Sequence, residues 1–306
     1  MMAQAPTSPG PLVFDRALIR ARRRRAAASG PVTFLLDRIS DELAERLGAV
    51  MRRFDRVLDL GMPGDAIHVA LSRLGSVGTI ITADALPPGE TTRTARYVLA
   101  DEEALPFCDG AFDLIVSALA LHFVNDLPGA LVQIRRALKP DGLFVAALLG
   151  GETLTELRQS FAAAESEIEG GVSPRVAPFA DLRDLGGLLQ RAGFALPVTD
   201  SDRLTVRYDS AFALMHDLRR MGATNALLDR RRTPLKRATL LRVAEAYAQS
   251  FVDGDGRLRA TFEILWLSGW APHPSQQQPL KPGSAKARLA DALGTREISA
   301  GDKAGR

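Results

Sequence analysis

Short apolar runs and helical segments alternate through the first half of the chain. Apolar runs that predict strands lie at 56–60, 78–84, 96–101, 112–121 and 142–150. Helical spacing of apolar residues occupies 66–75 and 127–138 between them. Strands that are apolar throughout are typical of a parallel sheet with two buried faces. The pattern therefore predicts an α/β fold with helices on both faces of the sheet.

The segments on either side of this alternation add helices and two more strands. Helical spacing covers 13–28, 34–48, 151–168, 180–194 and 210–250. Two later runs, 204–208 and 259–270, have the composition of strands. The sequence Lys-Pro-Asp-Gly at 139–142 predicts a turn between a helix and the fifth strand.

Composition and charge narrow the class of protein. The chain has 306 residues, 46% of them hydrophobic and 25% charged, which is typical of a globular protein. The net charge of +3 is too small to predict a nucleic-acid partner. The single cysteine, Cys108, excludes an internal disulfide framework and fits a reducing compartment.

We expect neither a membrane span nor a secretory signal in this sequence. No window reaches the roughly 18 apolar residues of a membrane span, and the first residues lack the charged and apolar regions of a secretory signal. We interpret the arginine-rich residues 14–28 as an N-terminal helix in preference to part of a transit peptide. A cytoplasmic protein is expected, with the inner face of the membrane as an alternative site.

Acidic residues close successive predicted strands. Ligands of open α/β sheets bind beyond the carboxyl ends of the strands, where Asp59, Asp84 and Asp101 lie. A carboxylate after the second strand can accept two hydrogen bonds from a ribose diol, and Asp101 can meet the amine of an adenine. Gly61 allows close approach of the backbone to a ligand.

Each acid alone is more often a turn or helix cap. Their occurrence at three successive strand ends instead favours a site for S-adenosylmethionine (SAM). The predicted cofactor-binding residues are Asp59, Gly61, Met62, Asp84, Ala85, Asp101, Glu102, Ser117 and Ala118. The chain contains neither GxGxxG nor GxxxxGK[ST], so a pyrophosphate loop and an NTPase are disfavoured.

His122 is the candidate catalytic residue. It follows the fourth predicted strand, where it can face either a methyl donor or a substrate, or pack beneath the next helix. No histidine and carboxylate pattern indicates an iron facial triad. Cys108 lacks partners for zinc, and no GxSxG motif is present. No metal site is predicted.

Arginine runs leave two interpretations open. The first run is Arg20 with 22–25; the second comprises Arg219, Arg220, Arg230, Arg231, Arg232, Lys236 and Arg237. Both runs are interpreted either as solvated surface or as docking faces for an acidic protein or an anionic membrane. Interleaved aromatic residues are absent, which disfavours single-stranded nucleic acid.

Specific motifs resemble one family. LADEEALPF at 99–107, the segment 112–144 that contains HFVNDLP, GGETLTELR at 150–158 and the loop 170–179 carry the resemblance, together with FDRALIRARRRRAA at the start. On these residues the chain resembles class I SAM-dependent methyltransferases. Within them it is most similar to the complex I assembly factor 5 group and its bacterial relatives, and more distantly to malonyl-carrier-protein methyltransferases.

The resemblance implies a fold and a site. The fold would be a seven-stranded, Rossmann-like sheet whose last two strands form an antiparallel edge pair, with a helical insertion between them. Asp59 and Gly61 would hold the methionine end of SAM, Asp84 the ribose, and Asp101 with Glu102 the adenine side. The expected regions are 1–11 disordered, 12–50 N-terminal helices, 51–208 SAM-binding core, 209–257 helical insertion, 258–272 last strand and 273–306 mostly disordered tail.

One loop departs from the family pattern, which is near D-L-G-C-G-x-G. Pro63 and Asp65 stand at the positions of its second and third glycines. Proline lacks an N–H, and a carboxylate near the carboxylate of SAM is repulsive. We therefore expect a weakened or reshaped SAM site.

Three functions stay open on the sequence. The first is a SAM-dependent methyltransferase that acts on a protein acceptor in the assembly of respiratory complex I. The second, implied by the resemblance, is an arginine hydroxylase whose partner would be an iron–sulfur subunit of NADH dehydrogenase. The third is a non-catalytic assembly chaperone with a degraded SAM site.

Overall fold

The computed structural model describes residues 12–61, 64–88, 96–277 and 289–296. The chain divides into two compact units, Met1–Pro272 and His273–Arg306. The described part of the second unit holds one short helix, α9 (Leu289–Leu293). In the described part of the chain, no helix is both long and apolar enough to cross a membrane.

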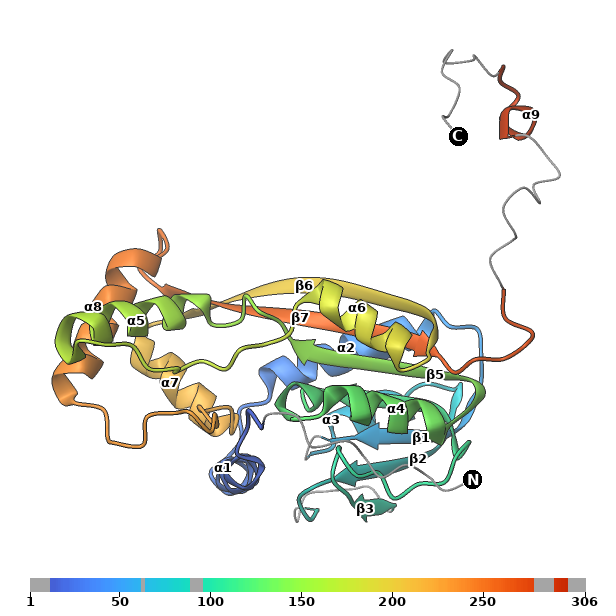
Figure 1. Cartoon of the computed structure of the whole chain (residues 1–306), viewed down its shortest axis with the longest axis horizontal. Coiled ribbons are helices and arrows are strands. Elements are labelled where there is room, and N and C mark those ends of the chain that lie inside the picture. Colours follow the sequence, from blue (N-terminus) through green and yellow to red (C-terminus); the bar gives the residue numbers. More distant parts are fainter. Residues whose placement is uncertain (1–11, 62–63, 89–95, 278–288, 297–306) are drawn as a thin grey trace, which may run out of the picture. The chain divides into compact units, whose positions relative to one another are not determined.

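The first unit is built on one mixed sheet (Figure 1). Its described strands are β1 (Phe54–Leu60), β2 (Val77–Asp84), β3 (Tyr97–Leu99), β4 (Phe112–Ala118), β5 (Leu138–Leu149), β6 (Ala195–Tyr208) and β7 (Leu258–Trp270). Their order is β3-β2-β1-β4-β5-β7-β6. β1 to β5 are parallel, and β7 is antiparallel to both β5 and β6. The predicted seven-stranded fold with an antiparallel edge pair is confirmed.

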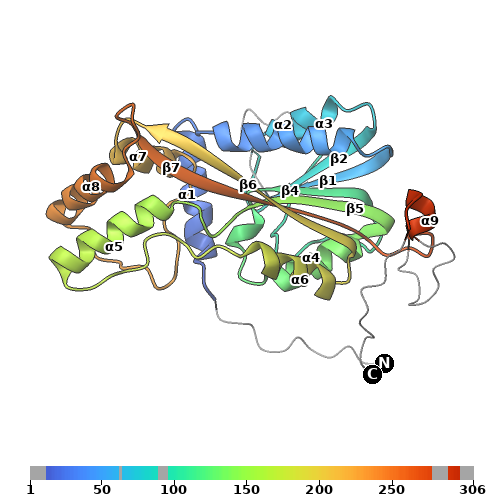
Figure 2. The ribbon, with the colours of Figure 1, turned by 90° about the horizontal axis from the view of Figure 1, so that it is seen from above.

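Helices cover both faces of the sheet, as predicted (Figure 2). α2 (Phe34–Gly48) and α3 (Ala66–Ser72) lie on one face, and α4 (Leu127–Ala137) and α6 (Leu182–Arg191) lie on the other. Each face has its own apolar core, because consecutive residues of the buried strands point to opposite sides. Val57 and Val116 belong to the first core, and Leu58 and Ile115 to the second.

The remaining helices lie beyond the strand ends. β6 and β7 extend past the parallel strands, and α5 (Thr155–Glu169), α7 (Ala211–Arg220) and α8 (Arg237–Phe251) gather around this extension (Figure 2). α1 (Arg16–Ala28) lies between these helices and the parallel strands. The segment 210–250 is thus two helices and a connection, where the sequence indicated one helical block.

The fourth strand is shorter than the sequence predicted. It ends at Ala118 and not at 121, because Leu119 has the left-handed φ of 53°. A 3₁₀ turn, η1 (Leu121–Phe123), follows directly. The turn places His122 just past the sheet, in position for the site described below.

Two other strand boundaries differ from the prediction. The expected turn at 139–142 is a bulge inside β5, since the pairing with β4 jumps from Phe112–Leu138 to Leu114–Leu143. Asp141 takes a φ of 63° within the bulge. β6 begins at Ala195 and not at 204, because its first residues alternate between exposed and half-buried and carry no apolar run.

Candidate functional site

The acids predicted to bind the cofactor lie at one edge of the sheet. Asp59 and Asp84 are on the neighbouring parallel strands β1 and β2, and Asp101 and Glu102 follow β3. Asp59, Asp84 and Glu102 have 2%, 0% and 1% of their surface exposed. The topology therefore collects at least three buried carboxyl groups in one small volume.

Asp59 is set up as a neutral group. Burial, and then the nearby charge of Asp84, raise the pKa of Asp59 to about 8. At neutral pH this side chain carries a proton unless a cation reaches it. Burial also raises the pKa of Asp84, although the Arg23 guanidinium opposes the rise.

Arg23 of α1 lies among these acids. Its Nη2 donates to Asp84 Oδ2 at 2.5 Å and to the backbone oxygen of Gly61 at 2.8 Å. Its Nη1 lies 3.7 Å from Glu102 Oε1. The Arg23 side chain is 9% exposed. A cation of the protein itself therefore contacts the groups that were expected to receive the ribose and the methionine end of SAM.

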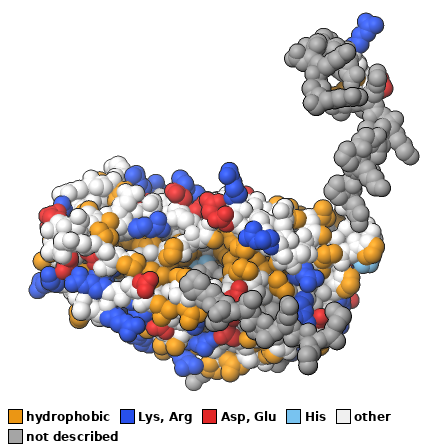
Figure 3. All heavy atoms as spheres, in the orientation of Figure 1, with side chains coloured by type: hydrophobic (Ala, Val, Ile, Leu, Met, Phe, Trp, Pro, Cys, Tyr) orange, Lys and Arg blue, Asp and Glu red, His pale blue; other side chains and the backbone are white. Residues whose placement is uncertain are grey.

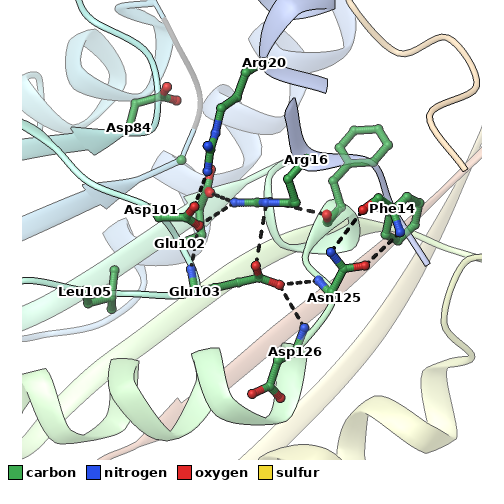
Figure 4. Close-up of polar contacts among 12 residues, drawn as sticks. Phe14, Arg16, Arg20, Asp84, Asp101, Glu102, Glu103, Leu105, Asn125 and Asp126 are labelled. Atoms are coloured by element: carbon green, nitrogen blue, oxygen red, sulfur yellow. Dashed lines mark hydrogen bonds and ion pairs between the residues drawn. The ribbon is translucent and has the colours of Figure 1, made fainter. Parts of the chain in front are cut away.

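Two further arginines of α1 meet the acids after β3 (Figure 4). Arg16 pairs with Asp101 at 2.6 Å and also with Glu102, while Arg20 pairs with Asp101. Burial opposes the ionisation of Asp101, but the Glu103 N–H and the two arginines outweigh it, so its pKa lies below the usual range. Asp101 and Glu102 thus lie beside the predicted cofactor pocket with arginine partners in place.

The interpretation of the first arginine run as solvated surface or a docking face is wrong for Arg20 and Arg23. Arg16, Arg20 and Arg23 are four and three residues apart, which places them on one face of α1. That face points to the strand-end acids, and each of the three arginines forms an ion pair with one of them. The spacing of these arginines could have shown from the sequence that they share one face. Their acidic partners lie more than sixty residues away in sequence, so the pairing itself could not be read from it.

The family-like motifs hold α1 in this place (Figure 4). Asn125 Oδ1 accepts from the N–H groups of Val13 and Phe14 at 2.8 and 2.7 Å, and its amide donates to the Phe14 oxygen at 3.1 Å. Glu103 accepts from the backbone N–H groups of Asn125 and Asp126. The motifs DEE and HFVND therefore form one polar network with the entry to α1.

The loop after β1 requires glycine at position 61. Gly61 has a φ of 104°, and a Cβ there would lie 2.5 Å from the Ala120 Cβ. No side chain fits at this position. Gly64 has a φ of 119° with open space around it. Met62 and Pro63 lie outside the described residues, so the predicted contact of Met62 stays a prediction.

Ser117 and Ala118 are almost fully buried at the end of β4. The Ser117 hydroxyl donates to the Leu60 oxygen at 2.8 Å and so ties β4 to β1. Ala85 is half-buried beside Asp84, whose Oδ1 accepts from the Leu86 N–H at 2.6 Å. The three residues predicted to contact the cofactor therefore lie at the carboxyl ends of β2 and β4. The Ser117 hydroxyl is already engaged in its hydrogen bond to Leu60.

His122 faces a large cleft without a polar partner. Neither ring nitrogen has a hydrogen bond among the described residues, and both are shielded from solvent. Its ring packs on Phe123 and Phe179, with centroids 4.1 and 5.7 Å away. Burial, and then the charge of Arg23, lower the pKa of His122 to about 3. The imidazole is therefore neutral at physiological pH.

The cleft has a volume of about 1670 Å³. Its walls are mostly apolar and include Leu35, Leu119, Phe161, Phe179 and Met215, with Arg23 and His122 among the polar members. Hydrophobic side chains surround the middle of the face drawn in Figure 3, and basic side chains follow its lower left edge. The strand-end acids and an apolar cleft therefore meet at Arg23.

The second arginine run is also partly internal. Arg230 pairs with Asp15 at 3.1 Å, and Arg231 and Lys236 pair with Glu169 at 3.2 and 2.8 Å. The run includes four exposed residues, Arg219, Arg232, Lys236 and Arg237, for which solvated surface and docking face both stay open. In the described part of the chain, no group of three or more His, Cys, Asp or Glu side chains has the arrangement of a metal site. Cys108 is exposed and free.

The polar groups at the strand ends fit a SAM-type ligand under one condition. Acceptors for a ribose and for an amine lie at Asp84, Gly61 and Asp59, and the close backbone at Gly61 admits a ligand. The condition is that Arg23 releases Asp84 when the ligand arrives, because one carboxylate oxygen already accepts from it at 2.5 Å.

Comparisons with known proteins place the chain in a family. Residues 58–146 match the family described as Methyltransferase domain. The mitochondrial arginine-hydroxylase NDUFAF5 of Danio rerio is 41% identical over 286 residues, which cover 91% of this chain and 89% of the relative. The malonyl-[acyl-carrier protein] O-methyltransferase of Laribacter hongkongensis is 35% identical, with 88% and 94% covered.

A solved structure supports the fold independently. The YcgJ protein from Bacillus subtilis superposes with a TM-score of 0.52 at 18% identity, covering 77% of this chain and 99% of that protein. With the strand order above, these similarities confirm the predicted family, and SAM is the cofactor of its superfamily. The chain belongs to the class I SAM-dependent methyltransferases, within the family of the NDUFAF5 arginine-hydroxylases.

Proposed function

We propose that this chain is a SAM-binding enzyme that modifies a protein acceptor during the assembly of respiratory complex I. The observation that carries the proposal is the convergence of Asp59, Asp84 and Glu102, all buried, at the carboxyl ends of adjacent parallel strands. That edge is where open α/β sheets bind nucleotide-like ligands.

Each part of the ligand has an assigned partner. Asp84 accepts the ribose hydroxyls, and the Gly61 oxygen and Asp59 receive the amine. Asp101 and Glu102 line the adenine side, with Ser117, Ala118 and Ala85 as apolar or backbone contacts. Because the pKa of Asp59 is raised to about 8, arrival of a cationic group expels a proton from this residue. SAM, when bound, supplies an activated methyl group.

The size of the cleft supports a macromolecular acceptor. Small-molecule sites commonly measure roughly 300–1,000 Å³, whereas this cleft measures about 1670 Å³ and is mostly apolar. His122 lies in its wall and is neutral, and it orients an acceptor group by hydrogen bonding when its ring, whose nitrogens are shielded from solvent, turns toward the cleft. With a pKa near 3 it is a weak proton acceptor, and the chain's contribution is mainly positioning.

A second candidate is hydroxylation of an arginine on an iron–sulfur subunit of NADH dehydrogenase. The names of the relatives that are 41–42% identical over most of the chain favour it. Under this hypothesis the cleft admits an arginine-bearing segment of the partner. Hydroxylation inserts one oxygen atom into a C–H bond and therefore requires an oxidant beyond the residues described here.

Calorimetric titration with SAM tests the cofactor. We expect wild-type protein to bind SAM and the Asp84→Ala variant to lose binding, because the ribose loses its acceptor. An Asp109→Ala variant serves as the matched control, since Asp109 is an exposed acid that pairs with Arg136 far from the strand-end acids. Absence of binding in the wild type would remove the SAM proposal.

Intact-mass analysis of the iron–sulfur subunit then separates the chemistries. The subunit is compared between cells with the wild-type chain and cells with Asp84→Ala. A gain of one methylene indicates methylation, and a gain of one oxygen indicates hydroxylation. An unchanged mass with impaired complex I assembly would instead support a non-catalytic chaperone, and normal assembly without the chain would contradict the proposed role.

A further inference from the structure

The backbone of α1 is fixed above the site from several sides. Arg22 donates to the backbone oxygen of Thr224 at 2.7 Å, and Asn125 holds the residues that precede the helix. Gly222 has a φ of 72°, and a Cβ there would lie 3.1 Å from the Arg23 Cα. The helix is thus packed closely at Arg23 itself. A ligand that takes Asp84 displaces the Arg23 side chain more readily than it displaces the helix.

Arg23 also has donors to spare. Its Nε is buried and has no hydrogen-bond partner among the described residues. Among the described residues, its Nη1 makes only the 3.7 Å contact with Glu102, while Nη2 makes both short bonds. Because five N–H groups of a guanidinium seek acceptors, this side chain has unused capacity in the wall of the cleft.

An unpaired guanidinium at this depth is costly. When a ribose takes Asp84, the Arg23 side chain is more than nine-tenths buried and lacks its nearest anion. Removal of one partner from a buried ion pair is strongly unfavourable unless another anion replaces it. A ligand that brings its own anion therefore suits this pocket better than one that does not.

The sequence of the loop after β1 departs from the glycine-rich family pattern at two positions that bear on anion binding. Pro63 has no N–H, and Asp65 adds a negative charge at a position where the family pattern has glycine. Gly61, at the start of this loop, already contacts Arg23 through its backbone oxygen. The guanidinium is thus the cation adjacent to the loop that is expected to hold the methionine end of SAM.

We propose that Arg23 binds the carboxylate of the methionine moiety of SAM, to which it passes from Asp84 when the ribose arrives. Arg23 thereby supplies a cation beside the altered loop, where it already contacts the Gly61 oxygen. The exchange replaces one ion pair, Arg23–Asp84, with two ligand contacts, ribose to Asp84 and carboxylate to Arg23. This inference rests on the proposed SAM site and adds a residue that determines which ligands the site accepts.

Paired calorimetric titrations with SAM and with decarboxylated SAM test this role. The two ligands differ in the carboxylate alone. We expect Arg23→Ala to bind SAM about 10- to 100-fold more weakly than wild type, the range for a charge-assisted hydrogen bond, and to bind decarboxylated SAM without comparable loss. Arg23→Lys should recover part of the affinity for SAM, because it keeps the charge without the planar fork. Arg25→Ala is the matched control, an exposed arginine on the same helix that does not line the cleft.

The outcomes separate this inference from the proposed function. Failure of wild-type protein to bind SAM would overturn both. Wild-type binding with unchanged or tighter binding by Arg23→Ala would overturn the inference alone and identify Arg23 as a competitor of the ligand. Equal weakening for both ligands would show that Arg23 only positions the pocket. If thermal unfolding shows that Arg23→Ala is not folded, Arg23→Gln is titrated in its place. We expect it to lose affinity for SAM but not for decarboxylated SAM.

Discussion

The two ends of the site satisfy their polar groups in different ways. At the strand ends, Asp84 and Asp101 are engaged by arginines of α1 at 2.5 and 2.6 Å. In the cleft, His122 has two shielded ring nitrogens with no hydrogen bond among the described residues, and its neighbours are aromatic. The acids Asp84 and Asp101 at the cofactor end thus have cationic partners without a ligand, while the His122 ring nitrogens at the acceptor end have no polar partner among the described residues.

The two ends of the site therefore respond to a ligand in different ways. At the proposed SAM site, a cofactor exchanges with a cation of the protein, so its affinity is a difference between two sets of contacts. Beside His122, an acceptor group meets the aromatic rings of Phe123 and Phe179. The predictions below separate the two ends by charge removal, by pH and by anchoring.

Asp84→Ala should produce the largest loss of stability. It leaves the Arg23 guanidinium buried without its nearest carboxylate, and we expect the free energy of unfolding to fall by about 3–5 kcal/mol. Denaturant unfolding measures the change. The control is Asp109→Ala, which removes an ion pair with 58% and 68% exposed side chains and should cost only about 0–1 kcal/mol. Equal losses in the two variants would show that Arg23 is not confined.

Asp59→Asn should stabilise the protein increasingly as pH rises. The folded pKa of Asp59, about 8, lies above its ordinary value of 3.8, so its contribution to stability is full below pH 3.8 and is lost as pH rises through 8. Asparagine has no such loss. We expect the difference in unfolding free energy between variant and wild type to grow by about 2–4 kcal/mol from pH 4 to pH 8.

The exposed Asp55 of the same strand provides the control for this titration. Its side chain is 71% exposed, and Asp55→Asn should leave the pH dependence of unfolding close to that of wild type. A flat difference between Asp59→Asn and wild type would mean that Asp59 is ionised in the folded protein.

His122→Asn should remove a loss of stability at acidic pH. The folded pKa of His122, about 3, lies below its ordinary value of 6.5, so its contribution is full above pH 6.5 and is lost as pH falls toward 3. Between pH 6.5 and 5 we expect wild type to lose about 2 kcal/mol more than the variant. Nitrogen NMR of the ring gives the direct check, and a protonation step near pH 6.5 would contradict the shielded site.

Asn125→Ala should have the smallest effect on the free energy of unfolding, and its effect should be confined to the region around α1. It removes three hydrogen bonds that hold Val13 and Phe14, at a cost of about 1–2 kcal/mol. Hydrogen exchange should quicken in α1 and stay unchanged in α4. Equal acceleration in both helices would show that the network does not anchor α1 specifically.

The parts of the fold that follow from burial were predictable from sequence. Apolar runs in the sequence correspond to four strands covered by helices, β1, β2, β4 and β5. The acids at the ends of the first three strands lie together at the carboxyl ends of the sheet, as predicted. β6 was underestimated because its exposed first residues carry no such run. The bulge in β5 depends on a left-handed Asp141, which the Pro-Asp-Gly sequence indicated only as a turn.

The position of the candidate acids at the strand ends was predictable, but their pairing with arginines was not. Asp84 and Asp101 stood out because strand ends have a fixed place in the fold. Their arginine partners depend on how α1 packs across the sheet, which no local pattern specifies. The spacing of Arg16, Arg20 and Arg23 defines a face of α1 but does not say what covers it. The unpaired His122 likewise follows from the 3₁₀ turn after β4.

The structure of the protein with bound S-adenosylhomocysteine tests the central claim most directly. We predict that the ribose hydroxyls of the ligand bind Asp84, that its carboxylate lies against the Arg23 guanidinium, and that the Arg23–Asp84 contact is lost. A complex in which Arg23 keeps its contact with Asp84, or leaves the pocket without touching the ligand, would contradict the exchange at the strand ends.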